Sequence, residues 1–124
     1  MILDKELVFS SEQAVTADAA STNVLDLKAE GDAVGQELAI HAVVTANFAT
    51  LTSLTIKVQT SADNSSWSDV VLSPAIPVAS LKKGEEVFCI RVPKGFKRYV
   101  RLYYDVTGSN ATAGKVTAFM CKDI

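Results

Sequence analysis

The chain has 124 residues, 48% of them hydrophobic, and a formal net charge of −2. A chain of this length buries roughly two-thirds of its unfolded surface on folding, which is enough for one domain with one core. The small net charge argues against a nucleic-acid binder, and no apolar run is long enough to span a membrane. The start of the chain lacks a signal-peptide pattern, so we expect synthesis in the cytoplasm.

The charges are unevenly distributed along the chain. Residues 1–40 carry two lysines against eight acidic side chains, whereas residues 82–101 carry seven basic side chains against two acidic ones. An acidic leader and a basic later half could attract each other between copies of the chain. Ordinary solvated surface charge explains the same pattern, because exposed ion pairs contribute only about 0–1 kcal/mol.

Residues 1–20 are interpreted as an N-terminal arm or irregular segment, with an Ala-rich stretch at 10–21 that could also hold one helical turn. Residues 21–124 are predicted to form a single domain. Within it, alternation of apolar and polar side chains predicts antiparallel strands with one face buried. Counting a short run at 76–81, we expect eight strands, at residues 23–27, 37–46, 54–60, 68–73, 76–81, 86–92, 97–107 and 113–122.

Turn residues lie where these strands must reverse direction. Pro93 and Gly95 suit a turn between the strands at 86–92 and 97–107, and Gly84 suits the turn before them. Regular short strands without covering helices predict an all-β fold. We expect an antiparallel β-sandwich, most simply an eight-stranded jelly roll with an extended N-terminal segment; an immunoglobulin-like sandwich is the alternative.

The stretch "QTSADNSSW", residues 59–67, presents several oxygen ligands before the single tryptophan of the chain. Counted from Asp63 as a calcium loop, the sixth position is Ser68 instead of glycine and the twelfth is Pro74 instead of glutamate. We therefore interpret the stretch as a hairpin loop in which Asp63 or Asn64 bonds the nearby backbone. Trp67 would pack across the loop or onto the edge of the core.

His41 is the only histidine, and Glu37 would share its face in a strand. Together with Cys89 and Cys121 it offers three zinc ligands, but their spacing is not that of a zinc site. We expect a structural histidine, reduced cysteines without a disulfide, and neither a metal nor a cofactor. Without a nucleophile elbow, a phosphate-binding loop or a second general base, the sequence predicts no enzymatic activity.

Tyr99, Arg101 and Tyr103 project from one face of the strand predicted at 97–107. Two rings with a guanidinium between them could bind a sugar or a single-stranded base, could form the centre of a protein interface, or could stabilise the sheet by cross-strand contacts. Among the binding roles we favour protein contact, because the chain is acidic overall.

Several stretches resemble the capsid cement, or decoration, proteins of tailed bacteriophages. These are "MILDKELVFSSEQAVTADAASTNVLDL" at the N-terminus, then "LTSLTIKVQTSAD", "LSPAIPVASLKKGEEVFCIRVPKGFKRYVRLYYDVTG" and "TAGKVTAFM" in the same order. The resemblance spans nearly the whole chain, and "KGFKRYVRLYYDV" combined with "TAGKVTA" is its most specific part. Cys89, Cys121 and the stretch at 33–37 depart from the family pattern.

The resemblance implies a jelly-roll subunit that binds the outer surface of an icosahedral shell and staples neighbouring major capsid proteins. It also implies self-association, as a homodimer more than a trimer, and a location on the virion after synthesis in the bacterial host. With the leader reaching a neighbouring subunit, the expected interface residues are Phe9, Trp67, Tyr99, Arg101 and Tyr103. The alternative function is a carbohydrate-binding module for host recognition, with Trp67 or the tyrosines as its platform.

Overall fold

The structure is a computed structural model that describes residues 8–26, 38–91 and 97–122. Ten strands and one short 3-10 turn make up its regular structure. The strands are β1 (Val8–Ala14), β2 (Ala19–Ala20), β3 (Leu25–Asp26), β4 (Leu38–Ala49), β5 (Ser53–Ser61), β6 (Ser68–Leu72), β7 (Ile76–Pro77), β8 (Glu86–Arg91), β9 (Tyr99–Thr107) and β10 (Ala113–Lys122), with the turn η2 at Val78–Ser80. In this part of the chain, no helix is long and apolar enough to cross a membrane.

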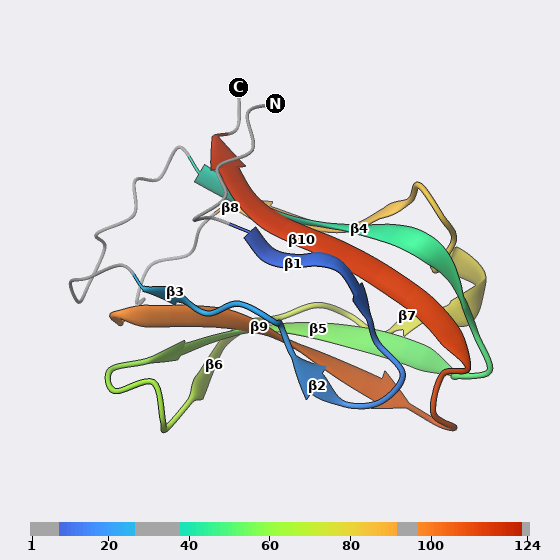
Figure 1. The fold of residues 1–124 in the computed structure, drawn as a ribbon, viewed down its shortest axis with the longest axis horizontal. Coiled ribbons are helices and arrows are strands. Elements are labelled where there is room, and N and C mark those ends of the chain that lie inside the picture. The colour runs from blue at the N-terminus through green and yellow to red at the C-terminus, as the bar shows by residue number, and fades with distance from the viewer. Residues whose placement is uncertain (1–7, 27–37, 92–96, 123–124) are drawn as a thin grey trace.

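The strands form two antiparallel sheets that face each other as two layers (Figure 1). The four-stranded sheet has the order β1-β10-β4-β8. The six-stranded sheet has the order β2-β9-β5-β6. In addition, β3 pairs with β9 on the same edge as β2, and β7 pairs with β5 on the same edge as β6. Since β2 with β3 and β6 with β7 each complete one broken edge strand, the topology is that of an eight-stranded jelly roll.

The core lies between the two layers and takes alternate residues from each long strand. From the six-stranded sheet come Leu54, Ile56 and Val58 of β5 and Val100, Leu102 and Tyr104 of β9, all fully buried. From the four-stranded sheet, β4 contributes Ile40, Ala42 and Val44, and β10 contributes Val116, Ala118 and Met120. The alternation that predicted these strands is confirmed, as is the all-β sandwich.

The structure differs from the prediction at the N-terminus. Residues 8–14 form β1, an edge strand that pairs antiparallel with β10, instead of an arm outside the domain. The alternation of β1 is interrupted by register shifts between Val8 and Ser10 and between Ser10 and Gln13, and Glu12 has a positive φ of 47°. Such irregularities hide a strand from a period-two search of the sequence.

The structure has ten strands instead of the eight expected. Residues 68–73 and 76–81, predicted as separate strands, supply β6 and β7, which share one edge of β5. Pro74 lies between them and has no backbone N–H to donate, so the edge strand is interrupted there. The prediction missed β1, which completes the four-stranded sheet, and β2, which pairs with β9 in the other sheet.

Candidate protein-binding surface

Three residues predicted to share a face lie together on the outer side of the six-stranded sheet. Tyr99, Arg101 and Tyr103 are half-buried in β9, whereas the residues between them are fully buried in the core. Their cross-strand partners on the neighbouring β5 are Ser61, Gln59 and Lys57 respectively. The outward direction of these three side chains therefore follows directly from the alternation of β9.

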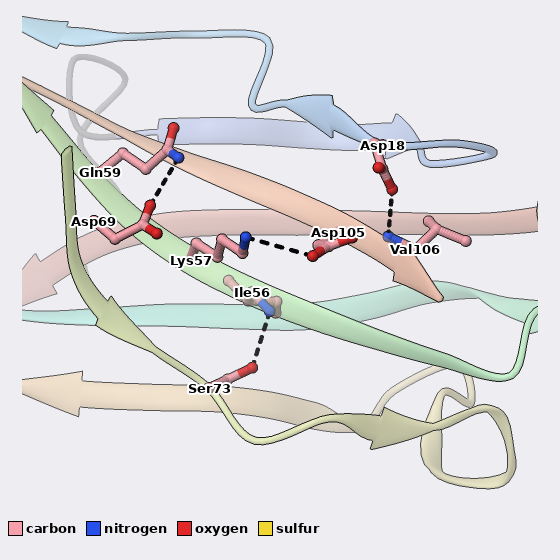
Figure 2. A network of polar contacts seen from close by, with 8 residues as sticks. All are labelled: Asp18, Ile56, Lys57, Gln59, Asp69, Ser73, Asp105 and Val106. Carbon is pink, nitrogen blue, oxygen red and sulfur yellow. Dashed lines mark hydrogen bonds and ion pairs between the residues drawn. The ribbon is translucent and has the colours of Figure 1, made fainter. Parts of the chain in front are cut away.

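Arg101 is at the centre of this surface and is held by stacking and by a hydrogen bond. Its guanidinium carbon lies 4.2 Å from the centre of the Trp67 ring and 5.8 Å from that of the Tyr103 ring. Its Nε donates to Gln59 Oε1 at 2.8 Å, and Gln59 Nε2 in turn donates to Asp69 Oδ1 at 2.9 Å (Figure 2). Partial burial lowers the pKa of Arg101 from its usual value, but a guanidinium remains charged at neutral pH.

Leu72 adds an apolar side chain to the same surface. It pairs with Lys57 across the β5–β6 ladder, and Lys57 pairs with Tyr103 across the β5–β9 ladder, so Leu72 and Tyr103 lie on the outer face on either side of Lys57. Leu72 is 54% exposed, and among the described residues it is the one large hydrophobic side chain in contact with solvent to this degree. We refer to Trp67, Leu72, Tyr99, Arg101 and Tyr103 together as the arginine–aromatic face.

Charged side chains border the arginine–aromatic face. Lys57 Nζ lies 3.4 Å from Asp105 Oδ2, and both side chains are partly exposed (Figure 2). At the end of β9 near Tyr99, the Arg98 guanidinium carbon lies 5.1 Å from the centre of the Tyr99 ring. The result is an aromatic and cationic centre with a polar rim, which resembles the composition of protein interfaces.

The hairpin loop at residues 61–67 places Trp67 next to Arg101. Asp63 Oδ1 accepts hydrogen bonds from the Ser65 and Ser66 backbone N–H groups at 2.9 Å and 3.0 Å and from the Ser61 hydroxyl at 2.9 Å. These bonds lower the pKa of Asp63, because they favour its charged form. The predicted Asx-type turn is confirmed, with Asn64 in the left-handed region at φ 60°. The Trp67 ring, however, packs on Arg101 instead of on the core.

Phe9 is not on this surface. Its side chain is fully buried among the core residues between the two sheets, because β1 forms part of the four-stranded sheet. A side chain without exposed area cannot contact a partner, so the interface role expected for Phe9 does not fit its position. The other four expected interface residues, Trp67, Tyr99, Arg101 and Tyr103, are brought together by the fold.

His41 lies on the opposite side of the molecule, on the outer face of the four-stranded sheet. It is largely buried, its ring stacks on Phe119 with centroids 5.4 Å apart, and Nδ1 donates to Glu86 Oε1 at 2.7 Å. A hydrogen-bonded histidine was expected, although the carboxylate partner is Glu86; Glu37, the partner suggested by the sequence, lies outside the described residues.

The two cysteines lie on different strands of the four-stranded sheet. Cys89 pairs with His41 on β4, and Cys121 pairs with Ala39 on the other side of β4. Strands two positions apart are separated by about 10 Å, beyond the Cα separation of about 7 Å that a disulfide tolerates. The fold therefore excludes a disulfide between Cys89 and Cys121 within one chain, as predicted.

Sequence reasoning missed one member of the surface, Leu72, and the residue that holds Arg101 in place, Gln59. Leu72 could have been found from its neighbour, because an inward Val71 on a strand implies an outward Leu72. The role of Gln59 depends on the pairing of β5 with β9 and β6, which no local pattern reveals. Long-range register is thus what builds this surface.

Comparison with known proteins gives one family. No curated protein matches the chain. A family model, Bbp16, matches residues 9–120, which covers the fold from β1 to β10, and the family name is associated with bacteriophages. Because this match includes nearly the whole chain, the protein belongs to the Bbp16 family.

Proposed function

We propose that the protein is a capsid cement protein that binds the outer surface of an assembled phage shell through its arginine–aromatic face. The observation that supports this most is the stacking of Arg101 on Trp67, with the Tyr103 ring within cation–π distance, on the outer face of the sheet. Tryptophan, tyrosine and arginine are the residues most enriched at the energetic centres of protein interfaces. The phage-associated family name and the resemblance to decoration proteins are compatible with this role.

The face is organised for binding before a partner arrives. Gln59 and Asp69 hold the Arg101 side chain in one orientation, and the hairpin capped by Asp63 holds Trp67 above it. Side chains already ordered in the free protein lose less conformational entropy on binding. The exposed Leu72 on the same side of the sheet provides apolar area that a partner would remove from water.

The proposed mechanism is mass action on a lattice. A protein that binds the assembled shell but not the separate capsid subunits stabilises the shell by its binding free energy at every site. The major capsid protein is the proposed partner, and the soluble protein is proposed to be a homodimer that a shell two-fold axis could accept. Light scattering of the purified protein measures the second part of this proposal directly.

Shell binding is tested by co-sedimentation with shells assembled from the cognate major capsid protein. Arg101→Ala and Leu72→Asp are each expected to weaken binding by about tenfold or more, as substitutions at interface centres do. Arg101→Lys keeps the charge but not the planar stack, and is expected to bind with intermediate affinity. Lys115→Ala, an exposed change on the other sheet, is the matched control and should bind as the unmodified chain does. Equal sedimentation of all four variants would reject the face as the binding surface.

The carbohydrate-binding alternative uses the same rings. Arg101 already covers one side of the Trp67 ring at 4.2 Å, which leaves a sugar only the other side. No further observation in the described structure favours this function. A glycan array probed with the purified protein separates the two proposals, because a saccharide bound by the protein and lost in Trp67→Ala would support carbohydrate recognition.

A role of the N-terminal leader in shell binding is not tested cleanly by deleting all of residues 1–20. Deletion of residues 1–20 would remove β1 and the buried Phe9 along with any contact to a shell. Deletion of residues 1–7 leaves β1 in place. If the leader reaches a neighbouring subunit, this shorter deletion weakens shell binding without changing the melting temperature, and unchanged co-sedimentation would contradict that role.

A further inference from the structure

A histidine, a glutamate and a cysteine meet on the outer face of the four-stranded sheet, on the side opposite to the arginine–aromatic face. His41 lies in β4, and Glu86 and Cys89 lie in β8. One ligand atom from each residue, the His41 ring nitrogen, a Glu86 carboxylate oxygen and Cys89 Sγ, lies within 4.8 Å of the other two. These three atoms are of the types that zinc binds in proteins.

Strand pairing explains why His41 and Cys89 are neighbours. They are directly opposite each other in the β4–β8 register, so their side chains share one face of the sheet. Phe88 and Ala42, the next pair, both point into the core. The pairing joins residues that are 48 positions apart in the chain, since it connects position 41 to position 89.

A bulge in β8 brings Glu86 to the same face. The register changes from Ala42 opposite Phe88 to Val43 opposite Glu86, so β8 has one extra residue, Val87, at this point. In a regular strand, side chains two positions apart share a face, so Glu86 would point inward with Phe88 if there were no bulge. Val87 packs against the core, and Glu86 instead points outward beside His41. Bulges commonly redirect a side chain in this way next to functional sites.

The His41 side chain is fixed in orientation. Its ring stacks on the buried Phe119 at 5.4 Å with an interplanar angle of 20°, and its side chain is 11% exposed. Nδ1 points toward Glu86, whose side chain is 43% exposed, and Cys89 is also exposed. The cluster thus has one nitrogen ligand of fixed orientation and two ligands on exposed side chains.

The other two members of the cluster both interact with the Glu86 carboxyl group. The hydrogen bond from His41 lowers the pKa of Glu86, burial partly opposes this effect, and a further hydrogen bond from Cys89 adds to the lowering. The cluster combines a nitrogen, an oxygen and a sulfur donor on two paired strands. Neither packing of the core nor an ordinary charged surface explains why these three residue types lie together.

We propose that His41 Nδ1, the Glu86 carboxylate and Cys89 Sγ bind a divalent transition-metal ion, with Zn²⁺ as the preferred ion. Nitrogen and thiolate ligands favour zinc over magnesium or calcium, which take oxygen ligands. Three protein ligands leave one tetrahedral position for water or for a group from a partner. This site is independent of the arginine–aromatic face and of the proposed role in shell binding.

Binding requires only small movements. Ligand bonds of about 2.0–2.3 Å place tetrahedral ligand atoms roughly 3.3–3.8 Å apart. The Glu86 oxygen must move away from its 2.7 Å contact with Nδ1, and the exposed Cys89 side chain must close in. The His41 ring proton moves from Nδ1 to Nε2, and the Cys89 thiol releases its proton to solvent as it becomes a thiolate. The bound ion would then tie β4 to β8.

The site is tested on the full-length reduced protein, first stripped of metal with a chelator. Titration with Co²⁺ is expected to produce thiolate-to-cobalt charge-transfer and tetrahedral ligand-field absorption that saturates at one ion per chain and is displaced by Zn²⁺. Cys89→Ser and Glu86→Gln are each expected to weaken binding by about 100-fold or more, since even residues behind the ligands change metal affinity by about 10–100-fold. Far-UV circular dichroism of each variant verifies that it is folded.

Two matched controls accompany these variants. Glu85→Gln changes the adjacent exposed glutamate, and Cys121→Ser removes the other thiol; both are expected to retain the cobalt spectrum and the affinity. A rise in melting temperature with Zn²⁺ in the unmodified chain, lost in Cys89→Ser, would give independent support. The proposal is overturned if Co²⁺ gives no thiolate band, or if the band survives in folded Cys89→Ser and disappears in Cys121→Ser.

Discussion

The Tyr104 hydroxyl is a polar group enclosed in the core. Its side chain is fully buried, and its oxygen lies 2.8 Å from the Ser10 hydroxyl. Ser10 donates its own proton to Gln13 Oε1 at 2.6 Å, so the tyrosine donates to Ser10. This chain of hydrogen bonds links β9 to β1 through the interior and satisfies the buried groups that it contains.

Tyr104→Phe is expected to lower the free energy of unfolding by about 1 kcal/mol at neutral pH, the typical value of one buried hydrogen bond. Burial raises the pKa of Tyr104 to about 12 from 10.0. The folded state thus favours the neutral phenol, and stability present below pH 10 falls as the pH rises toward 12. Two pKa units correspond to a loss of about 3 kcal/mol.

Urea denaturation between pH 8 and pH 12 measures this dependence. The alkaline loss should be smaller in Tyr104→Phe by that amount. Tyr103→Phe serves as control and keeps the loss, because the Tyr104 hydroxyl is still present. Identical pH profiles for the unmodified chain and Tyr104→Phe would show that this residue is not the source.

Gly114 is required by the approach of Phe48 as well as by its backbone conformation. It has φ 141°, and a Cβ built on it would lie 2.4 Å from Phe48 Cδ2. Phe48 is buried in the core and cannot move away freely. Gly114→Ala is therefore expected to destabilise the protein by about 2–5 kcal/mol, from backbone strain together with overpacking.

Gly84→Ala is the matched control for that change. Gly84 also has a positive φ, 92°, but a Cβ there would meet nothing within 4 Å. Only the backbone cost of about 1–3 kcal/mol applies to it. Thermal denaturation of both variants separates the two effects, and equal destabilisation would mean that the Phe48 contact contributes nothing.

At the scale of the elements, β1 makes the N-terminal segment part of the domain. It covers one edge of β10 and buries Phe9, and Gln13 accepts hydrogen bonds from the Thr22 backbone and hydroxyl, both at 2.8 Å. Loss of a buried phenylalanine alone costs about 3–5 kcal/mol, a large fraction of the roughly 5–15 kcal/mol that stabilises a typical domain.

Deletion of residues 1–14 is therefore expected to abolish folding and to expose the edge of β10 to aggregation. Deletion of residues 1–7 should leave a cooperative thermal transition, because β1 remains. Circular dichroism and size-exclusion chromatography of the two truncations compare these outcomes. A folded, monodisperse protein after the longer deletion would contradict the role given to β1.

For the whole molecule, the sandwich has a single core shared by the two sheets, and its first and last long strands are paired. We expect one cooperative unfolding transition, with refolding on the slow scale of milliseconds to seconds typical of such non-local sheets. Trp67 fluorescence reports the outer hairpin, and far-UV circular dichroism reports the sheets. Their midpoints should coincide; an earlier fluorescence transition would mean that the hairpin opens independently.

The all-β class and most of the strands follow from the residue pattern alone. Alternation in β5 and β9 identified both the core residues and the outward Tyr99, Arg101 and Tyr103, because a strand has a side-chain period of two. Asp63 likewise predicted its turn, since that turn depends only on nearby backbone groups. These features are local, and local sequence is sufficient for them.

Contacts between residues far apart in the chain, in contrast, depend on how the strands pair in the folded protein. The register of β5 with β9 and β6 places Gln59 between Arg101 and Asp69. Phe9, which was expected at an interface, is buried in the core because β1 is part of the four-stranded sheet. The β8 bulge turned Glu86 toward His41, which simple alternation would not have done. Pairing between strands far apart in the chain and bulges within them set these contacts, and neither leaves a periodic signal in the sequence.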